Sequence, residues 1–179
     1  MPPLFLIGYM GSGKTTLGKC LAKKLGLSFI DMDLFIENRY RKSISLIFKE
    51  HGEDKFREIE HKVLEEIVGF ENTVISTGGG LPCYFNNMEL MNGHGTTIYL
   101  KASPDELASR LKNSKDNRPL IKDKAPTELK EFIREGLNKR ETYYQKAALA
   151  ISVENLNSRK EIEAKVDELI YHLEKQSVL

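Results

Sequence analysis

A glycine-rich segment near the start of the chain constrains the fold more than any other feature. Residues 8–15 read Gly-Tyr-Met-Gly-Ser-Gly-Lys-Thr, which matches the spacing G-x-x-x-x-G-K-[ST]. The apolar run 4–7 precedes this segment, and apolar residues recur at helical spacing after it until Gly26. A phosphate-binding loop requires this context, with a strand before the motif and a helix after it. The sequence therefore predicts a strand at 4–7, a phosphate-binding loop, and a helix that begins near Lys14.

The residue types in this segment suit a polyphosphate ligand. Glycines leave the backbone N–H groups open to an anion, and the following helix adds the positive end of its dipole. Lys14 would supply a mobile charge for the β- and γ-phosphates, while the Thr15 hydroxyl could ligate Mg²⁺. A chance match in a glycine-containing turn would occur in only about one in a few hundred chains. We therefore expect a nucleotide to contact Gly11, Ser12, Gly13, Lys14, Thr15 and Thr16.

Composition and charge exclude several other classes of protein. The 179 residues carry 27 basic and 26 acidic side chains, a net charge of +1, which offers no electrostatic case for binding nucleic acid or a membrane. No apolar run approaches the ~20 residues of a membrane span, and the start lacks the features of a secretory signal. We expect a single cytoplasmic domain, 1–179, that acts as a monomer, with Cys20 and Cys83 as free thiols.

Short β-like runs alternate with helical patterns along the chain. Besides 4–7, they are 28–30, 73–76, 97–100 and 150–153. This alternation predicts an α/β fold, in which a parallel sheet with right-handed crossovers carries helices on both faces. Capping sequences at Ser103 and Ser158 mark the starts of two of these helices.

Two regions interrupt this alternation. About forty residues separate the second and third strands, too many for one crossover helix, and three helical patterns lie there, 33–41, 44–51 and 54–68. They predict an inserted helical subdomain, whose substrate-binding part covers about 33–61. The second region, 113–124, is polar, charged and interrupted by a proline between two helical patterns. We expect a mobile lid there, with an ordinary surface loop as the alternative.

We expect the second strand to end in Asp31-Met32-Asp33. Asp31 and Asp33 are two residues apart, so on a continued strand they would share one face. That face would lie at the carboxyl end of the sheet, where open parallel sheets bind ligands. One carboxylate could hold Mg²⁺ through water, and the other could take a proton from a substrate hydroxyl. The alternative is a pair of solvated aspartates in a strand-to-helix turn, where aspartate is common.

Arginines and glycines further along the chain could bind an anionic substrate. Arg57 and Glu60 share a helix face, either as a surface ion pair or as a guanidinium held to meet a carboxylate. Three glycines, residues 78–80, would expose bare backbone N–H groups at the end of the third strand, where we favour ligand contact over a flexible turn. In the expected lid, Arg118 could stabilise the charge on a transferring phosphate. Arg140 taken alone would be assigned to the surface.

Together these motifs resemble those of the shikimate kinase family. The segments that carry the resemblance, in the family's order and rough spacing, are residues 8–16, Asp31-x-Asp33, Phe56-Arg57-x-x-Glu60, residues 78–80, Arg118-Pro119-Leu120 and Arg140-x-x-x-Tyr144. The match spans residues 4 to about 153, nearly the whole chain. The glycine triplet with the Phe-Arg-x-x-Glu segment is far more specific than the phosphate-binding loop, which many proteins share.

The resemblance implies a fold and a reaction. The fold would be that of the nucleoside-monophosphate-kinase-like P-loop kinases, a five-stranded parallel sheet of order 2-3-1-4-5 with a helical insertion and a lid. The reaction would transfer the γ-phosphoryl group of ATP to the 3-hydroxyl of shikimate, with Mg²⁺ as cofactor. Its products would be ADP and shikimate 3-phosphate, for aromatic amino-acid biosynthesis.

The resemblance also implies roles for the matching residues. Lys14, Asp33 and Arg118 would be catalytic, with Asp33 in contact with the reacting hydroxyl. Thr15 would ligate Mg²⁺, and Asp31 would lie near the metal.

Substrate contacts follow from the same resemblance. Besides the phosphate-binding loop, ATP would meet Arg118 in the lid and Arg110, which would stack on the adenine. Phe48 and Phe56 would form apolar walls of the second pocket. The residues implied in binding shikimate, chiefly its carboxylate, are Asp33, Arg57, Gly79, Gly80 and Arg140. The family often has an Asp-Thr turn after the fifth strand, whereas residues 153–157 read Val-Glu-Asn-Leu-Asn, so a second adenine contact is left open.

Two rival functions are open on the sequence alone. A gluconate kinase or another small-molecule kinase of the same fold is the nearest, but the glycine triplet with Arg57 and Arg140 favours a small carboxylate over a nucleobase. A GTPase-like switch would be a different class of protein. It would need a guanine-reading Asn-Lys-x-Asp segment, which the chain lacks.

Overall fold

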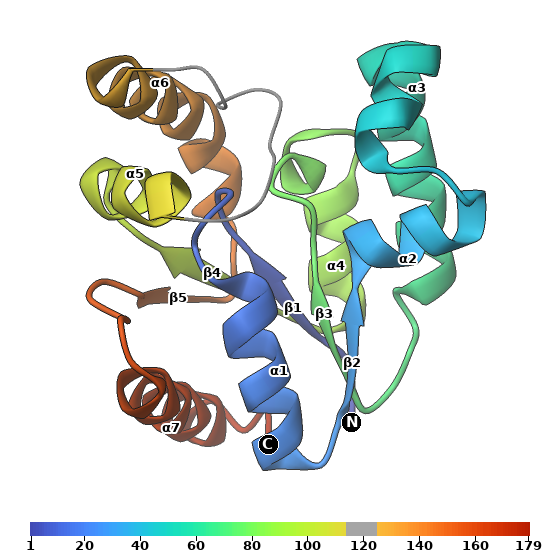
Figure 1. Ribbon diagram of the computed structural model, residues 1–179. Coiled ribbons are helices and arrows are strands. Elements are labelled where there is room, and N and C mark those ends of the chain that lie inside the picture. The colour runs from blue at the N-terminus through green and yellow to red at the C-terminus, as the bar shows by residue number, and fades with distance from the viewer. Residues whose placement is uncertain (114–124) are drawn as a thin grey trace.

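One parallel sheet organises the fold. The computed structural model describes residues 1–113 and 125–179. The strands are β1 Leu4–Ile7, β2 Ser28–Asp31, β3 Thr73–Ser76, β4 Thr96–Lys101 and β5 Leu149–Ser152. All neighbouring strands are parallel, in the order β2-β3-β1-β4-β5 (Figure 1). The strand order implied by the resemblance is confirmed, and each strand lies within one residue of its predicted bounds.

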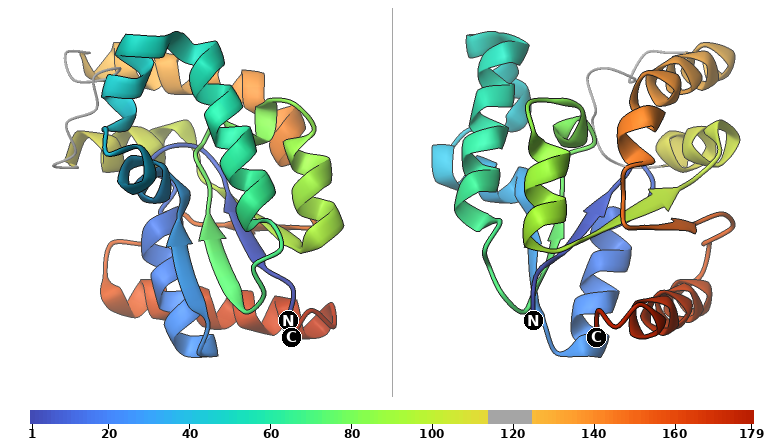
Figure 2. Two further views of the ribbon diagram at one scale, coloured as in Figure 1. Left: turned by 90° about the vertical axis from the view of Figure 1, so that its right-hand side faces the viewer. Right: turned by 180° about the vertical axis from the view of Figure 1, so that it is seen from behind.

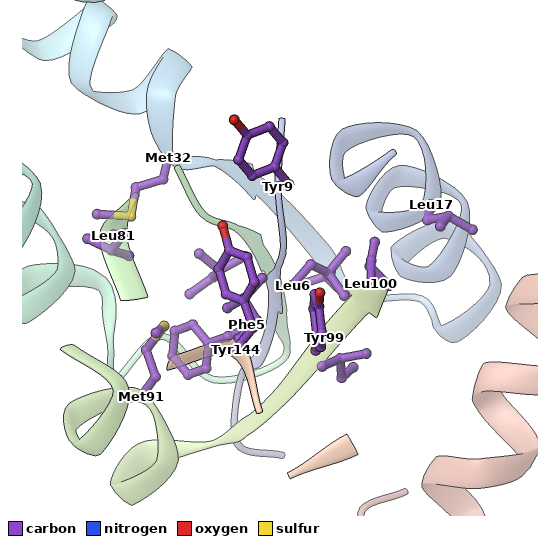
Figure 3. Close-up of a cluster of buried hydrophobic side chains, with 14 of the residues drawn as sticks. Phe5, Leu6, Tyr9, Leu17, Met32, Leu81, Met91, Tyr99, Leu100 and Tyr144 are labelled. Atoms are coloured by element: carbon purple, nitrogen blue, oxygen red, sulfur yellow. The ribbon is translucent and has the colours of Figure 1, made fainter. Parts of the chain in front are cut away.

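Helices cover both faces of the sheet. They are α1 Lys14–Leu25, α2 Met32–Tyr40, α3 Ile44–Ile67, α4 Asn87–His94, α5 Pro104–Asn113, α6 Pro126–Tyr144 and α7 Arg159–Lys175, with a short 3₁₀ helix, η1 Leu81–Cys83. On one face α1 and α7 pack side by side, and on the other lies α4 with the end of α3 (Figures 1 and 2). Because both faces are covered, β1 and β3 are continuously buried instead of alternating. Figure 3 shows side chains around β1 in this core.

Local sequence sets the helix boundaries. Ser158 and Glu161 form the capping box predicted at the start of α7. At α5 the Ser103 hydroxyl accepts the N–H of Glu106 at 3.2 Å, as a cap should. The N–H of Ser103 itself donates to Glu154 at 2.5 Å, and not to Glu106. Glu154 thereby ties the segment after β5 to the start of α5.

The predicted helical insertion lies between β2 and β3. It consists of α2 and α3, which pack on each other at the upper right of Figure 1. The predicted helices 44–51 and 54–68 are joined in α3 across a break at Gly52. With φ of 78° and ψ of 175°, Gly52 is not helical, so it marks the boundary that the sequence pattern indicated.

Candidate active site

A pocket of about 390 Å³ opens at the carboxyl ends of β2 and β3, beside the phosphate-binding loop and the start of α1. Open parallel sheets bind ligands at this edge. The predicted site residues that line the pocket are Gly11, Gly13, Lys14, Thr15, Thr16, Asp31, Asp33, Gly79 and Arg110. The fold thus brings separate segments of the chain to one hollow.

The phosphate-binding loop holds the Lys14 ammonium at its centre. Gly11 and Gly13 have φ of 82° and 91°, which L side chains rarely adopt, so the loop needs glycine at both positions. Nζ of Lys14 donates to the carbonyl oxygens of Gly8 at 2.8 Å and Tyr9 at 3.1 Å. The positive charge therefore lies at the loop and at the N-terminus of α1, where the helix dipole adds to it.

Ser12 adds an unused donor to this loop. Its side chain is buried, and its hydroxyl oxygen has no hydrogen-bond partner among the described residues. Buried polar atoms normally have partners, because an unsatisfied one costs about 1–3 kcal/mol. A phosphate oxygen held in the loop would supply such a partner.

Asp31 and Asp33 reach the pocket in a way that differs from the prediction. β2 ends at Asp31, whose side chain caps α2 by accepting the Leu34 N–H at 3.3 Å. Asp33 therefore lies in the first turn of α2, and the prediction that both aspartates share a strand face is wrong. The physical reason is that an N-cap aspartate starts a helix at the point where the strand would have continued. Both carboxylates still line the pocket, and Oγ1 of Thr15 donates to Oδ2 of Asp31 at 2.7 Å.

Arg57 is a buried arginine that α3 holds between two carboxylates. It is 8% exposed, which excludes the alternative of a solvated surface pair. Nη1 of Arg57 donates to Glu60 at 2.5 Å, while Nη2 and Nε donate to Glu53 at 2.8 and 3.2 Å. The Tyr84 ring lies against the guanidinium, 4.5 Å from Cζ to the ring centre, and the Tyr84 hydroxyl donates to Glu53 at 2.9 Å. The guanidinium is therefore fixed from several sides.

Glu53 and Tyr84 are site residues that the sequence analysis missed. Glu53 lies four residues before Arg57, a spacing that pairs opposite charges on a helix and could have indicated it. Tyr84 comes from the loop after η1, and no local pattern points to it. Phe48 and Phe56, the predicted apolar walls, have ring centres 4.4 Å apart and both lie within 6 Å of the Arg57 Cζ.

The glycine triplet lets charged side chains approach bare backbone. A β-carbon at Gly78 would lie 2.5 Å from Oε1 of Glu60 and 3.1 Å from Oδ1 of Asp33. A β-carbon at Gly80 would lie 2.6 Å from Nη1 of Arg57. Real β-carbons do not approach other atoms to below 3 Å, so a side chain at either position would displace these charged groups.

Arg140 reaches the same stretch of backbone from α6. Its Nη1 would lie 3.5 Å from a β-carbon on Gly79, and its Cζ lies 5.0 Å from the centre of the Tyr9 ring. Tyr144, one turn later on α6, donates its hydroxyl to the Gly79 carbonyl at 2.6 Å. The fold thus makes Arg140 part of the site, although the sequence around it reads as surface.

Arg110 closes the pocket from α5. Its guanidinium donates to the carbonyl oxygens of Gly11 and Ser12, at 3.4 and 3.3 Å, and to that of Val153. Nε of Arg110 donates to Glu106 at 2.8 Å. Arg110 therefore joins α5 to the phosphate-binding loop, and its stacking on adenine stays a prediction.

Several other predictions have a simple outcome. Apart from residue 113, the predicted lid 113–124 lies outside the described residues, and so does Arg118. Cys20 and Cys83 are free thiols, as predicted. None of the described helices combines the length and apolarity that crossing a membrane requires.

Glu60 is a deeply buried carboxyl in the middle of this arrangement. It is 2% exposed, and burial raises the pKa of its carboxyl to about 7, although the Arg57 guanidinium acts in the opposite direction. The nearby charge of Asp33 also raises the pKa of Glu60. Glu60 therefore titrates close to neutrality, beside an arginine that keeps its charge.

We expect this pKa to make the stability of the protein depend on pH. Between the ordinary value of 4.5 and about 7, the folded protein keeps a proton at Glu60 that the unfolded chain has released. The free energy of unfolding should therefore fall as pH rises through this window, and Glu60→Gln should flatten the fall. Denaturant unfolding across the window measures the slope. Asp54→Asn, at an exposed carboxylate of α3, should leave the slope unchanged, and an equal slope in wild type and Glu60→Gln would contradict the assignment.

Comparison with known proteins decides the family. The family model described as shikimate kinase matches residues 10–172. The chain belongs to the shikimate kinase family. A shikimate kinase from Azobacteroides pseudotrichonymphae genomovar. CFP2 is 57% identical to it over 91% of this chain and 96% of the relative.

Solved structures of shikimate kinases share the whole fold. One from Bacteroides thetaiotaomicron has a TM-score of 0.95 at 46% identity, covering 97% of this chain and 98% of the other. One from Acinetobacter baumannii, solved in complex with shikimate, has a TM-score of 0.86 at 29% identity, covering 100% of this chain and 96% of the other. As a member of the shikimate kinase family, the protein is an ATP-dependent phosphotransferase.

Proposed function

We propose that the protein transfers the γ-phosphoryl group of ATP to the 3-hydroxyl of shikimate, giving ADP and shikimate 3-phosphate. Membership of the shikimate kinase family supports this reaction. The observation that carries it is the approach of Asp33, Arg57 and Arg140 to the glycine triplet, beside the phosphate-binding loop. Two arginines suit a small carboxylate, and an aspartate suits a hydroxyl. A gluconate kinase is not favoured, because the relatives named above are shikimate kinases.

Each predicted residue has a place in this proposal. Lys14 and the loop bind the β- and γ-phosphates, with Arg110 and Arg118 as further ATP contacts. Asp33 orients the attacking hydroxyl and takes its proton. The residues that hold the remainder of shikimate are Arg57, Gly79, Gly80 and Arg140.

Thr15 and Asp31 would hold the Mg²⁺ ion that accompanies ATP. Their hydroxyl and carboxylate oxygens are already 2.7 Å apart, and hard oxygen donors are the ligands that Mg²⁺ prefers. No group of three or more His, Cys, Asp or Glu side chains suited to a metal occurs within 1–113 and 125–179. This fits an ion that takes one or two protein ligands and completes its shell with phosphate and water. When bound, Mg²⁺ would neutralise charge on the transferring phosphate.

We also propose that the enzyme works as a cytoplasmic monomer. The proposal assigns every contact with ATP and shikimate to residues of one chain, which suits a monomer. The free thiols of Cys20 and Cys83 support a reducing compartment.

A coupled ADP-release assay with shikimate, gluconate and nucleoside monophosphates tests the proposed function. Of these acceptors, we expect only shikimate to be phosphorylated. A shikimate analogue in which a neutral amide replaces the carboxylate should be a much poorer substrate, because two guanidinium groups lose their anion. Equal turnover of acid and amide would contradict the carboxylate contact, and turnover of gluconate in place of shikimate would contradict the reaction.

Arg57→Lys should weaken shikimate binding while the charge is kept. A charged hydrogen bond is worth roughly 1.5–3 kcal/mol, so we expect KM for shikimate to rise about 10- to 100-fold. A lysine ammonium cannot hold Glu53 and Glu60 in a planar fork and still face a carboxylate. KM for ATP should barely change. Arg159→Lys, at an exposed ion pair with Glu163, is the matched control and should change neither constant. An unchanged KM for shikimate in folded Arg57→Lys would show that Arg57 does not bind the substrate carboxylate.

A further inference from the structure

Tyr9 occupies a position in the phosphate-binding loop that the proposed mechanism does not use. Only its backbone takes part there, since its carbonyl accepts from Lys14 at 3.1 Å and from the Ser12 N–H at 3.1 Å. Its side chain is 1% exposed, so it is enclosed by protein and does not face solvent. Figure 3 draws it with Tyr144 among the buried side chains around β1. The Tyr9 side chain therefore extends from the phosphate-binding loop into the protein interior.

The Tyr9 side chain contacts α6 at two positions. The centre of its ring lies 5.0 Å from Cζ of Arg140, within the range of a cation–π contact. One turn earlier on α6, a β-carbon at Gly136 would lie 2.3 Å from the Tyr9 hydroxyl oxygen and 2.9 Å from Cε2 and Cζ of the ring. The tyrosine thus fits into a notch on the helix that only glycine can provide.

Glycine at position 136 is otherwise unfavourable. It lies in the interior of α6, where glycine costs stability relative to alanine because it loses more backbone freedom. The missing side chain is explained by the Tyr9 ring, which occupies the space. Both residues are therefore needed for α6 to approach the loop closely enough for Arg140 to lie over the ring.

We propose that Tyr9 is a positioning residue that, seated in the Gly136 notch, sets where the Arg140 guanidinium meets the substrate carboxylate. The inference rests on the proposed function, since it assigns Arg140 to a carboxylate. Through its side chain, Tyr9 connects the loop that would bind the phosphates to Arg140, which would bind the substrate carboxylate. The position of the acid is thereby fixed relative to the position of the transferring phosphate.

The kinetic test compares Tyr9→Leu with Tyr9→Phe. Loss of the ring should raise KM for shikimate about 5- to 30-fold, the equivalent of one partly desolvated cation–π contact, while KM for ATP changes little. The preference for shikimate over its neutral amide should fall by the same factor, because Arg140 no longer stands at the carboxylate. Tyr9→Phe keeps the ring and should keep both values near wild type. Tyr171→Leu, at an exposed tyrosine of α7, is the control.

A second test needs no substrate. Gly136→Ala should lower the melting temperature by about 3–10 °C, since a β-carbon would collide with the ring. In the Tyr9→Leu background the same change should be neutral or stabilising, as alanine usually is in a helix. Gly93→Ala in α4, where a β-carbon would meet nothing within 4 Å, should not lower the melting temperature in either background.

The outcomes separate this inference from the function on which it rests. A Gly136→Ala effect that is equally harmful with and without the Tyr9 ring would overturn the notch. An unchanged preference for acid over amide in Tyr9→Leu would overturn the positioning role. If the wild type showed no shikimate-dependent turnover, the proposed function would fail, and the positioning role with it, while the melting-temperature cycle would still decide the contact between Tyr9 and Gly136.

Discussion

Lys14→Ala should lower kcat for phosphoryl transfer about 10³-fold or more, because the variant lacks the positive charge that meets the transferring phosphate. Lys14 is held at the loop by the Gly8 and Tyr9 carbonyls, so its ammonium is preorganised where the phosphate charge develops. An alanine leaves the backbone N–H groups and the helix dipole in place, and these alone should still bind nucleotide weakly.

The measurement for Lys14→Ala is single-turnover phosphoryl transfer, with circular dichroism and shikimate binding by calorimetry as tests of folding. Shikimate affinity should be kept, since Lys14 lies on the phosphate side of the pocket. Lys19→Ala, on the exposed face of α1, is the matched control and should turn over normally. Near-normal turnover by folded Lys14→Ala would sink the assignment of the loop.

Asp33→Asn should lower kcat by about 10²–10⁴-fold, the usual contribution of a positioned general base. The asparagine is nearly the same size and keeps an oxygen toward the substrate hydroxyl, but it cannot accept a proton. Nucleotide binding should change little, because the proposal assigns Asp33 to the attacking hydroxyl and the nucleotide phosphates to Lys14 and the loop. A loss of less than about threefold would rule out the role.

Two further readings sharpen the Asp33 experiment. Asp54→Asn removes an exposed carboxylate of α3. It controls for the loss of a charge in the helical insertion and should leave kcat unchanged. Removing the charge of Asp33 should also lower the pKa of Glu60, because Asp33 is one of the causes that raise it. In Asp33→Asn the upper limit of the pH window over which stability falls should therefore shift to more acidic values, while the lower limit near 4.5, set by the unfolded chain, stays the same. A loss of kcat together with that shift would place Asp33 where the geometry puts it.

The phosphate side of the site was predictable because its determinants are contiguous. One octapeptide contains the glycines, the lysine and the threonine, and the strand and helix around it have clear local patterns. The part of the site proposed to bind the shikimate carboxylate depends on Arg57 and Arg140, which come from separate helices. Neither local pattern indicates that they converge, so their assignment came from the resemblance and not from spacing.

Two features of the structure could not be predicted from the sequence, and each has its own physical reason. Asp33 was placed on a strand because alternation was assumed to continue, whereas the Asp31 cap began α2 at Met32. The sequence does not indicate a role for Tyr9, which has the pattern of an ordinary loop residue, or for Gly136, which is only an unfavourable residue within a helix. Only the tertiary contact shows that each explains the other.

The glycine triplet has a consequence for inhibitors of this enzyme. Resistance to an inhibitor usually arises from a mutation that replaces a side chain in contact with the inhibitor. At Gly78 and Gly80 any exchange would add a β-carbon within 3 Å of Glu60 or Arg57, so the mutation that repels the compound would also disturb the residues that hold the substrate. A molecule that takes its hydrogen bonds from this backbone should therefore meet resistance mutations that carry a fitness cost, and serial passage under such a molecule would reveal it.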